Sequence, residues 1–142
     1  RQAPVSYFVD PSLGTAALGV GSGDLLADLR AAGFHFEALA IRDLRIYAQP
    51  LSGTVSTWRE VRGRQEVDAI IETPAGWAAF EIKLTGDQQV IDRAARQLVD
   101  FAANVDQSRH GAPKGLVVVT ATGGGGQRPD GVHIAPVSAI GP

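Results

Sequence analysis

The stretch Gln65–Thr85, QEVDAIIETPAGWAAFEIKLT, predicts two strands joined by a tight turn, and the rest of the chain is arranged around it. In the first strand, apolar residues at 67, 69 and 71 alternate with Glu66, Asp68, Ile70 and Glu72, and residues 74–76 (PAG) are a turn signal. The second strand has an unbroken apolar face at its even positions, 78 to 84. Because side chains alternate along a strand, its odd positions place Glu81 and Lys83 together on the other face.

The charged residues of this hairpin are the first candidates for a site. Glu81 and Lys83 project side by side, roughly 6–7 Å apart, and Asp68 lies on the neighbouring strand. Charged side chains are rarely placed on buried strands unless they are paired or bind a metal. The cluster therefore predicts one of two arrangements: a structural ion-pair cluster in which Lys83 bridges Asp68 and Glu81, or a metal site.

Composition limits the classes of protein that the chain could be. At 142 residues, 1–142 is expected to be one globular domain, and its apolar runs are too short to span a membrane. The absence of cysteine excludes disulfides and thiolate zinc sites, so cytoplasmic localisation is only the default expectation. A net charge of −2 does not provide the overall basic field of a dedicated nucleic-acid binder. Because the chain begins at Arg1 and contains no methionine, we expect it to be a fragment of a longer protein.

The other elements predict an α/β fold with a mixed sheet flanked by helices. Three short-linked strands should be antiparallel, and the helix after the hairpin should cross over to a parallel strand. The expected order is helix, three strands, helix, strand, strand. The segments are a short strand at 7–9, a helix from 10 to about 18, a loop at 19–24, a helix from 25 to about 48, and strands at 55–61, 67–72 and 77–84; these are followed by a helix from 87 to about 108, strands at 116–120 and 132–134, and a tail or helical turn from 136.

Two further polar positions and one basic cluster stand out. Glu37 lies on a largely apolar helix face, and Gln97 lies on or beside the apolar stripe of the later helix. Each is either a boundary residue or part of a site. Arg59, Arg62 and Arg64 form the densest basic cluster, which is either a solvated hairpin tip or a patch that contacts phosphates.

The ordered set of a helix glutamate, EVD on one strand, EIK on the next and a glutamine in the following helix resembles the PD-(D/E)XK nuclease superfamily. Glu37, Asp68, Glu81, Lys83 and Gln97 match the positions of that motif in order. The chain departs from the superfamily name at residues 66–67, where Glu-Val precedes the aspartate and a proline would stand. The resemblance implies a restriction-endonuclease-like core and metal-dependent hydrolysis of a phosphodiester.

The resemblance also implies a role for each matched residue. Asp68 and Glu81 would hold Mg²⁺ or Mn²⁺, and Glu37 would complete the metal shell directly or through water. Lys83 would orient or help to deprotonate the attacking water, or stabilise negative charge. Gln97 would position the lysine, the water or a phosphate oxygen.

A closer resemblance covers nearly the whole chain. The segments at 7–14 (YFVDPSLG), 33–44 (GFHFEALAIRDL), 63–72 (GRQEVDAIIE), 80–85 (FEIKLT) and 133–140 (HIAPVSAI) are similar to the uncharacterised C-terminal domain of a family of bacterial and archaeal AAA-type ATPases. This implies an ATPase module in the same chain as the partner, with ATP bound only there. Three function classes stay open: a nuclease, a catalytically silent module that binds nucleic acid or a partner protein, and a pure interaction or oligomerisation domain.

Overall fold

The central hairpin forms as the sequence predicts. The computed structural model describes residues 10–60 and 65–141, and within them β2 (Glu66–Thr73) and β3 (Gly76–Lys83) pair in antiparallel fashion. The turn is closed by the Thr73 hydroxyl, which donates to the Gly76 carbonyl at 3.0 Å and accepts from the Ala75 N–H at 3.2 Å. The predicted strand at 7–9, and Arg62 and Arg64 of the predicted basic cluster, lie outside the described residues.

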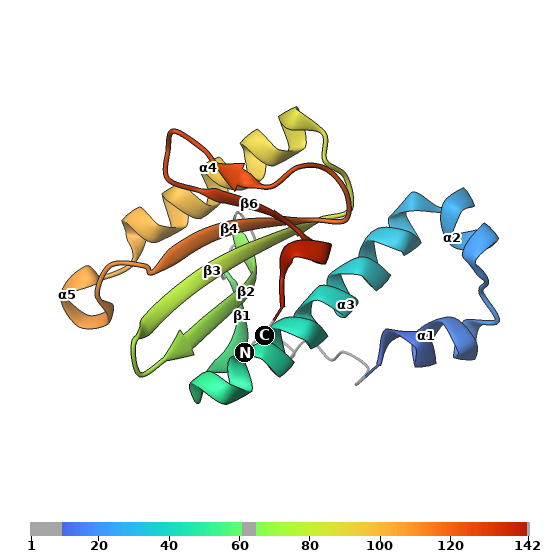
Figure 1. The fold of residues 1–142 in the computed structure, drawn as a ribbon, viewed down its shortest axis with the longest axis horizontal. Coiled ribbons are helices and arrows are strands. Elements are labelled where there is room, and N and C mark those ends of the chain that lie inside the picture. Colours follow the sequence, from blue (N-terminus) through green and yellow to red (C-terminus); the bar gives the residue numbers. More distant parts are fainter. Residues whose placement is uncertain (1–9, 61–64, 142) are drawn as a thin grey trace.

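Six strands form one mixed sheet in the order β1-β2-β3-β4-β6-β5 (Figure 1). The first three strands are antiparallel, whereas β4 pairs parallel with both β3 and β6. The predicted α/β class, the antiparallel trio and the parallel crossover are therefore confirmed. The remaining strands are β1 (Thr54–Arg59), β4 (Gly115–Thr120), β5 (Gly126–Gln127) and β6 (His133–Pro136).

Helices α3 (Leu29–Ala48) and α4 (Gln88–Asn104) cover opposite faces of the sheet (Figure 1). The buried side chains consequently divide into two clusters. The cluster on the α4 side includes Trp77, Ala79, Leu98 and Val118, and the cluster on the α3 side includes Ile41, Ile82 and Val119. Short 3-10 turns follow α3 and β6, at Gln49–Leu51 (η1) and Val137–Ala139 (η2).

Helix α4 begins within one residue of the predicted start at 87 and ends earlier than its sequence suggests. The Asp87 carboxylate accepts from the N–H groups of Gln89 and Val90, so Asp87 is the N-cap. The expected continuation to Ser108 is wrong, because Val105 is extended. A separate short helix, α5 (Gln107–His110), follows.

The N-terminal region departs most from the sequence-based expectation. The helix expected from 10 to about 18 is confirmed as α1 (Pro11–Leu18), but the single helix expected from Leu25 to Ala48 is divided into α2 (Ser22–Ala27), which begins inside the expected loop, and α3. The break falls at Asp28, whose carboxylate accepts from the first N–H groups of α3 and caps it. Figure 1 shows α1, α2 and the start of α3 extending away from the sheet. In the part of the chain that the structure describes, no helix combines the length and apolarity needed to cross a membrane.

A β-bulge in β2 corrects the predicted alternation. Ser56 pairs with Ile70 and Trp58 with Val67, so two steps along β1 correspond to three along β2. The extra residue moves Val67 to the α4 side, although Ala69 packs on the α3 side. Bulges of this kind redirect side chains, and here the bulge lies next to Asp68.

Candidate functional site

Asp68 lies at the point where β2 and β3 stop pairing. The last backbone pair joins Ala69 and Phe80, whereas β3 continues to pair with β4 as far as Lys83 and Thr120. Beyond that point the Asp68 carboxylate takes the place of a backbone acceptor from β2, because its Oδ2 accepts from the Ile82 N–H at 2.8 Å. The strand geometry therefore fixes this carboxylate beside the end of β3.

Lys83 bridges the two acidic residues. Its Nζ lies 2.6 Å from Glu81 Oε2 and 3.1 Å from Asp68 Oδ2. The exposed fractions of the side chains are 2% for Glu81, 12% for Asp68 and 27% for Lys83, so Lys83 is the member of the cluster that solvent reaches most. The predicted convergence of Asp68, Glu81 and Lys83 is observed.

The surroundings shift the pKa of both Glu81 and Lys83. Burial is the main cause that raises the pKa of Glu81 from 4.5 to about 7. Repulsion by the Asp68 carboxylate also raises this pKa, whereas attraction to Lys83 lowers it. Burial by itself would lower the pKa of Lys83, but attraction to Asp68 and Glu81 outweighs burial and raises it. The cluster therefore keeps a cationic lysine beside a carboxyl group that exchanges its proton near neutral pH.

Two buried oxygen atoms in this region have no hydrogen-bond partner among the residues that the structure describes: Glu81 Oε1 and Thr120 Oγ1. In the β3–β4 register, Thr120 lies opposite Lys83, and Glu81 lies opposite Val118, which packs on the α4 side. Because side chains alternate along each strand, Glu81, Lys83 and Thr120 share that face. Sequence reasoning did not single out Thr120; the signal available was its place at the end of the strand that the crossover makes parallel to β3.

Glu37 is a half-buried residue of α3. That helix packs against the face of the sheet that carries Ile82, the face opposite to the one toward which Glu81 points. Among residues 10–60 and 65–141, no group of three or more histidine, aspartate and glutamate side chains is placed to hold a metal ion. Glu37, Asp68 and Glu81 are therefore not assembled into a single three-carboxylate cluster.

The motif in the sequence groups Gln97 with Asp68, Glu81 and Lys83, but in the structure Gln97 makes a different contact. Its backbone carbonyl accepts from the Gln65 side-chain amide at 3.2 Å, which ties α4 to the start of β2. Its own side chain has no hydrogen bond to Asp68, Glu81 or Lys83 in the described structure. The catalytic role expected for Gln97 stays a prediction.

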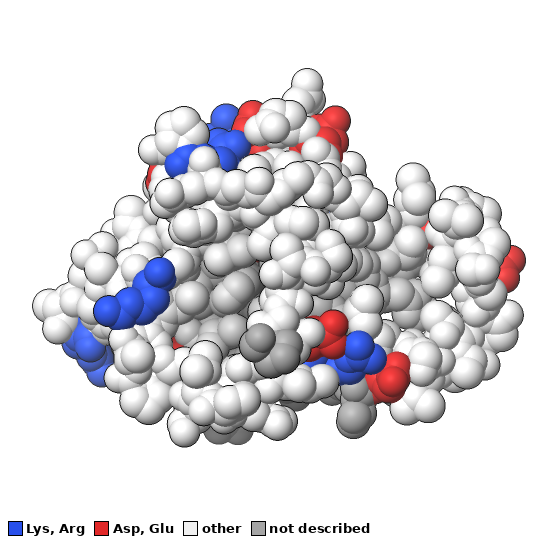
Figure 2. Space-filling model, in the orientation of Figure 1, with Lys and Arg blue, Asp and Glu red and all other residues white. Residues whose placement is uncertain are grey.

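The described arginine of the basic cluster is paired. Arg59 at the end of β1 forms an ion pair with Glu66, its partner across β1 and β2, and both side chains are more than half exposed. On the face shown in Figure 2, acidic and basic side chains are few and intermixed among uncharged residues. The described residues on this face therefore present no continuous basic field.

A search of curated proteins and of solved structures found no match to the chain. A family model described as a domain of unknown function, DUF4143, matches residues 32–140. This range starts within α3 and includes the whole sheet, α4 and the Asp68–Lys83–Glu81 cluster, so it covers most of the chain. The chain belongs to the DUF4143 family.

Proposed function

We propose that the domain is a metal-dependent phosphodiester hydrolase whose site contains Asp68, Glu81 and Lys83. The observation that carries this proposal is that two largely buried carboxylates, those of Asp68 and Glu81, meet at the Lys83 ammonium where β2 and β3 separate. The order of the residues along the chain, which resembles the PD-(D/E)XK nuclease motif, supports the same chemistry.

The donor atoms of the cluster fit a hard divalent cation. Mg²⁺ and Mn²⁺ prefer carboxylate oxygens, and Glu81 Oε1 is a buried carboxylate oxygen with no partner in the described structure. Asp68 and Glu81 would hold the ion. When bound, such an ion neutralises phosphate charge and lowers the pKa of water.

The protein's own groups would position the substrate. The Ile82 N–H holds Asp68 Oδ2 in place, so this carboxylate needs little rearrangement. Lys83, the most exposed of the three, would donate to a phosphate oxygen or to the attacking water. Glu37 and Gln97 would join the site only after a movement of α3 or of the glutamine side chain. Arg59, with Arg62 and Arg64, would contact phosphates beside it.

The first test is calorimetric titration of Mn²⁺ and Mg²⁺ into the wild type and three variants. We expect saturable binding that is lost in Asp68→Asn and Glu81→Gln, because each change removes one carboxylate charge while keeping the shape of the side chain. Glu66→Gln is the matched control, since Glu66 is an exposed carboxylate on the same strand. Absence of metal binding in a folded wild type would overturn the metal site.

Hydrolysis requires its own assay. Single- and double-stranded DNA and RNA should be incubated with the protein and Mn²⁺ or Mg²⁺, with Lys83→Met as the variant. We expect cleavage by the wild type and at least about a hundredfold loss in the variant, in line with the effect of removing one electrostatic contact in a catalytic site. Equal cleavage by both proteins would show that the nuclease activity does not belong to this site.

A catalytically silent module is the second candidate, and a specific observation favours it. Lys83 already pairs with both carboxylates and so balances one of their two charges without a metal. Such a module would bind nucleic acid or a partner protein. Nucleic-acid binding that persists in EDTA, without cleavage when metal is restored, would distinguish it from the hydrolase.

We place the domain beside an ATPase module in a longer chain. The support is the resemblance of segments such as residues 33–44 and 80–85 to the C-terminal domain of AAA-type ATPases. On this proposal, ATP binds only in that module and controls access of nucleic acid to the cluster. Comparison of cleavage by the isolated domain and by the full-length protein, with and without ATP, would test the coupling.

A further inference from the structure

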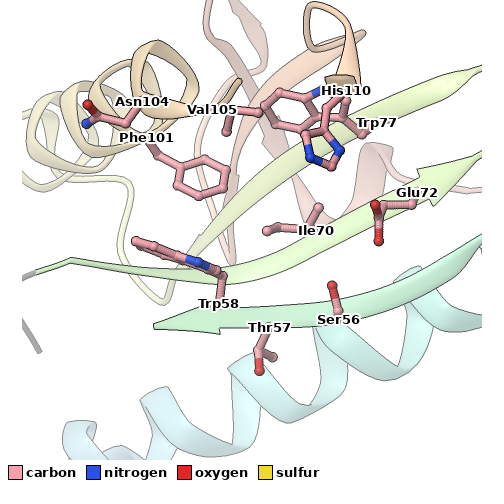
Figure 3. Close-up of a pocket in the computed structure, with 10 residues that line it drawn as sticks. All are labelled: Ser56, Thr57, Trp58, Ile70, Glu72, Trp77, Phe101, Asn104, Val105 and His110. Carbon is pink, nitrogen blue, oxygen red and sulfur yellow. The ribbon is translucent and has the colours of Figure 1, made fainter. Parts of the chain in front are cut away.

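A cavity of about 350 Å³, lined by none of the residues of the Asp68 cluster, lies between α4 and the edge of the sheet (Figure 3). Ile70 and Glu72 come from β2, Trp58 from β1, Trp77 from the start of β3 and Phe101 from α4. The volume is within the range of small-molecule sites, about 300–1,000 Å³. Neither the family match nor the proposed hydrolase assigns this cavity a role.

Three aromatic rings form one wall of the cavity. Phe101 lies between the two tryptophans, with ring centroids 5.0 Å from Trp58 and 6.0 Å from Trp77, at interplanar angles of 53° and 90°. The Trp77 indole N–H donates to the Gly111 carbonyl at 3.0 Å, which fixes that ring. All three rings line the cavity, and the faces of aromatic rings attract cations.

The charge at the rim has the complementary sign. Glu72 lies directly opposite Trp77 in the β2–β3 register, and its side chain is exposed beside the cavity (Figure 3). Within the described residues, Glu72 has no ion pair, and the cavity is lined by one histidine, His110, and by no lysine or arginine. An anionic ligand such as a nucleotide phosphate would meet this carboxylate unfavourably, whereas a cation would gain from both the carboxylate and the rings.

We infer that the cavity binds a compact organic cation, an ammonium group that carries apolar substituents. The apolar substituents would pack on Ile70 and the aromatic wall, and the positive charge would lie between the ring faces and Glu72. This inference is independent of the proposed hydrolase, because Glu72 lies on the part of β2 that remains paired with β3, beyond the cluster of Asp68.

The test uses the two tryptophans of the chain, both of which line the cavity, as reporters. Choline chloride should be titrated while fluorescence is followed at constant ionic strength. The control ligand is 3,3-dimethylbutan-1-ol, which has the same shape without the charge. We expect a saturable change with choline and at least about fivefold weaker binding of the neutral alcohol, because only the cation gains from the ring faces and the carboxylate.

Variants separate charge from packing. Glu72→Gln should weaken choline binding about threefold to tenfold, because it removes the rim charge but leaves the cavity intact. Glu66→Gln, at an exposed glutamate on the same strand, should leave binding unchanged. A peptide with trimethyllysine distinguishes the source of the cation: tighter binding than choline assigns the site to a side chain of a partner protein, and weaker binding assigns it to a free small cation.

Three results of the choline titrations would overturn the inference. These are equal binding of the alcohol and choline, unchanged choline binding in Glu72→Gln, and the absence of a saturable signal in the folded wild type. Adenosine should be titrated in the same way. Tighter binding of adenosine than of choline would show that the aromatic wall holds a nucleobase instead.

Discussion

At the scale of single residues, Glu81 is the group whose behaviour differs most from that of the free amino acid. Its carboxyl group is almost fully buried, and one of its oxygens has no hydrogen-bond partner in the described structure. The ion pair with Lys83 offsets part of the free-energy cost of burying this group. The sequence alone predicted the pairing of Glu81, Lys83 and Asp68, because strand alternation and a short turn bring them together. It could not predict the depth of burial, which depends on how α4 and β4 cover the end of β3.

The raised pKa of Glu81 predicts a dependence of stability on pH. Because the folded state holds this proton more tightly than the unfolded state, the free energy of unfolding should fall as the pH rises from 4.5 to about 7. The contribution of this one group amounts to about 3 kcal/mol, fully present below pH 4.5 and lost above pH 7. Urea unfolding at intervals between pH 5 and 8 measures it.

Glu81→Gln is the control for this pH dependence. The variant cannot ionise at residue 81, so it should show a flatter profile and should match or exceed the wild type in stability at pH 8. Parallel profiles for the two proteins would show that Glu81 is ionised throughout this range. The measurement needs no metal and no substrate, so it is independent of any catalytic role.

At the scale of elements, the separation of β2 from β3 explains why Asp68 differs from the other acidic residues of the hairpin. Alternation alone predicts Val67 and Ala69 on one face, but the bulge places them on opposite faces. A bulge has no reliable signature in the residues around it, since it depends on the register with β1. The sequence therefore identified Asp68 without revealing that its carboxylate substitutes for a strand partner.

Because the Asp68 carboxylate takes the place of a strand partner, two mutations at this position should lower the free energy of unfolding by different amounts. Asp68→Ala removes the acceptor for the Ile82 N–H and one partner of Lys83, and it should lower the free energy of unfolding by about 1–3 kcal/mol. Asp68→Asn keeps an oxygen acceptor and should cost less. Amide hydrogen exchange at Ile82 should accelerate in the alanine variant only. Equal exchange in both variants would show that another group satisfies this N–H.

At the scale of the whole molecule, the order of elements was predictable and the arrangement of the N-terminal helices was not. The hairpin, the crossover helix and the LVVVT strand each carry a strong local pattern, and short connections limit how they can pair. The apolar residues at 25, 26 and 29 follow the helical periodicity that is typical of a helix with one buried face. Leu26 and Leu29 are instead 78% and 67% exposed, because this part of the chain extends beyond the sheet. Periodicity predicts an apolar face but not whether a partner surface lies against it.

The position of α1 and α2 predicts that the sheet and its two main helices can fold without them. Neither of the two core clusters of the described residues contains a side chain from α1 or α2, and the family match begins at residue 32. A variant that begins at Asp28 keeps the residue that caps α3. We expect cooperative thermal unfolding with a Tm within about 5 °C of the full chain, since a change of 1 kcal/mol shifts Tm by roughly that amount.

A variant beginning at Leu29 lacks the cap and should be less stable by about 1 kcal/mol. Loss of cooperative unfolding in the longer variant would instead mean that the exposed leucines of the N-terminal helices contribute to the core.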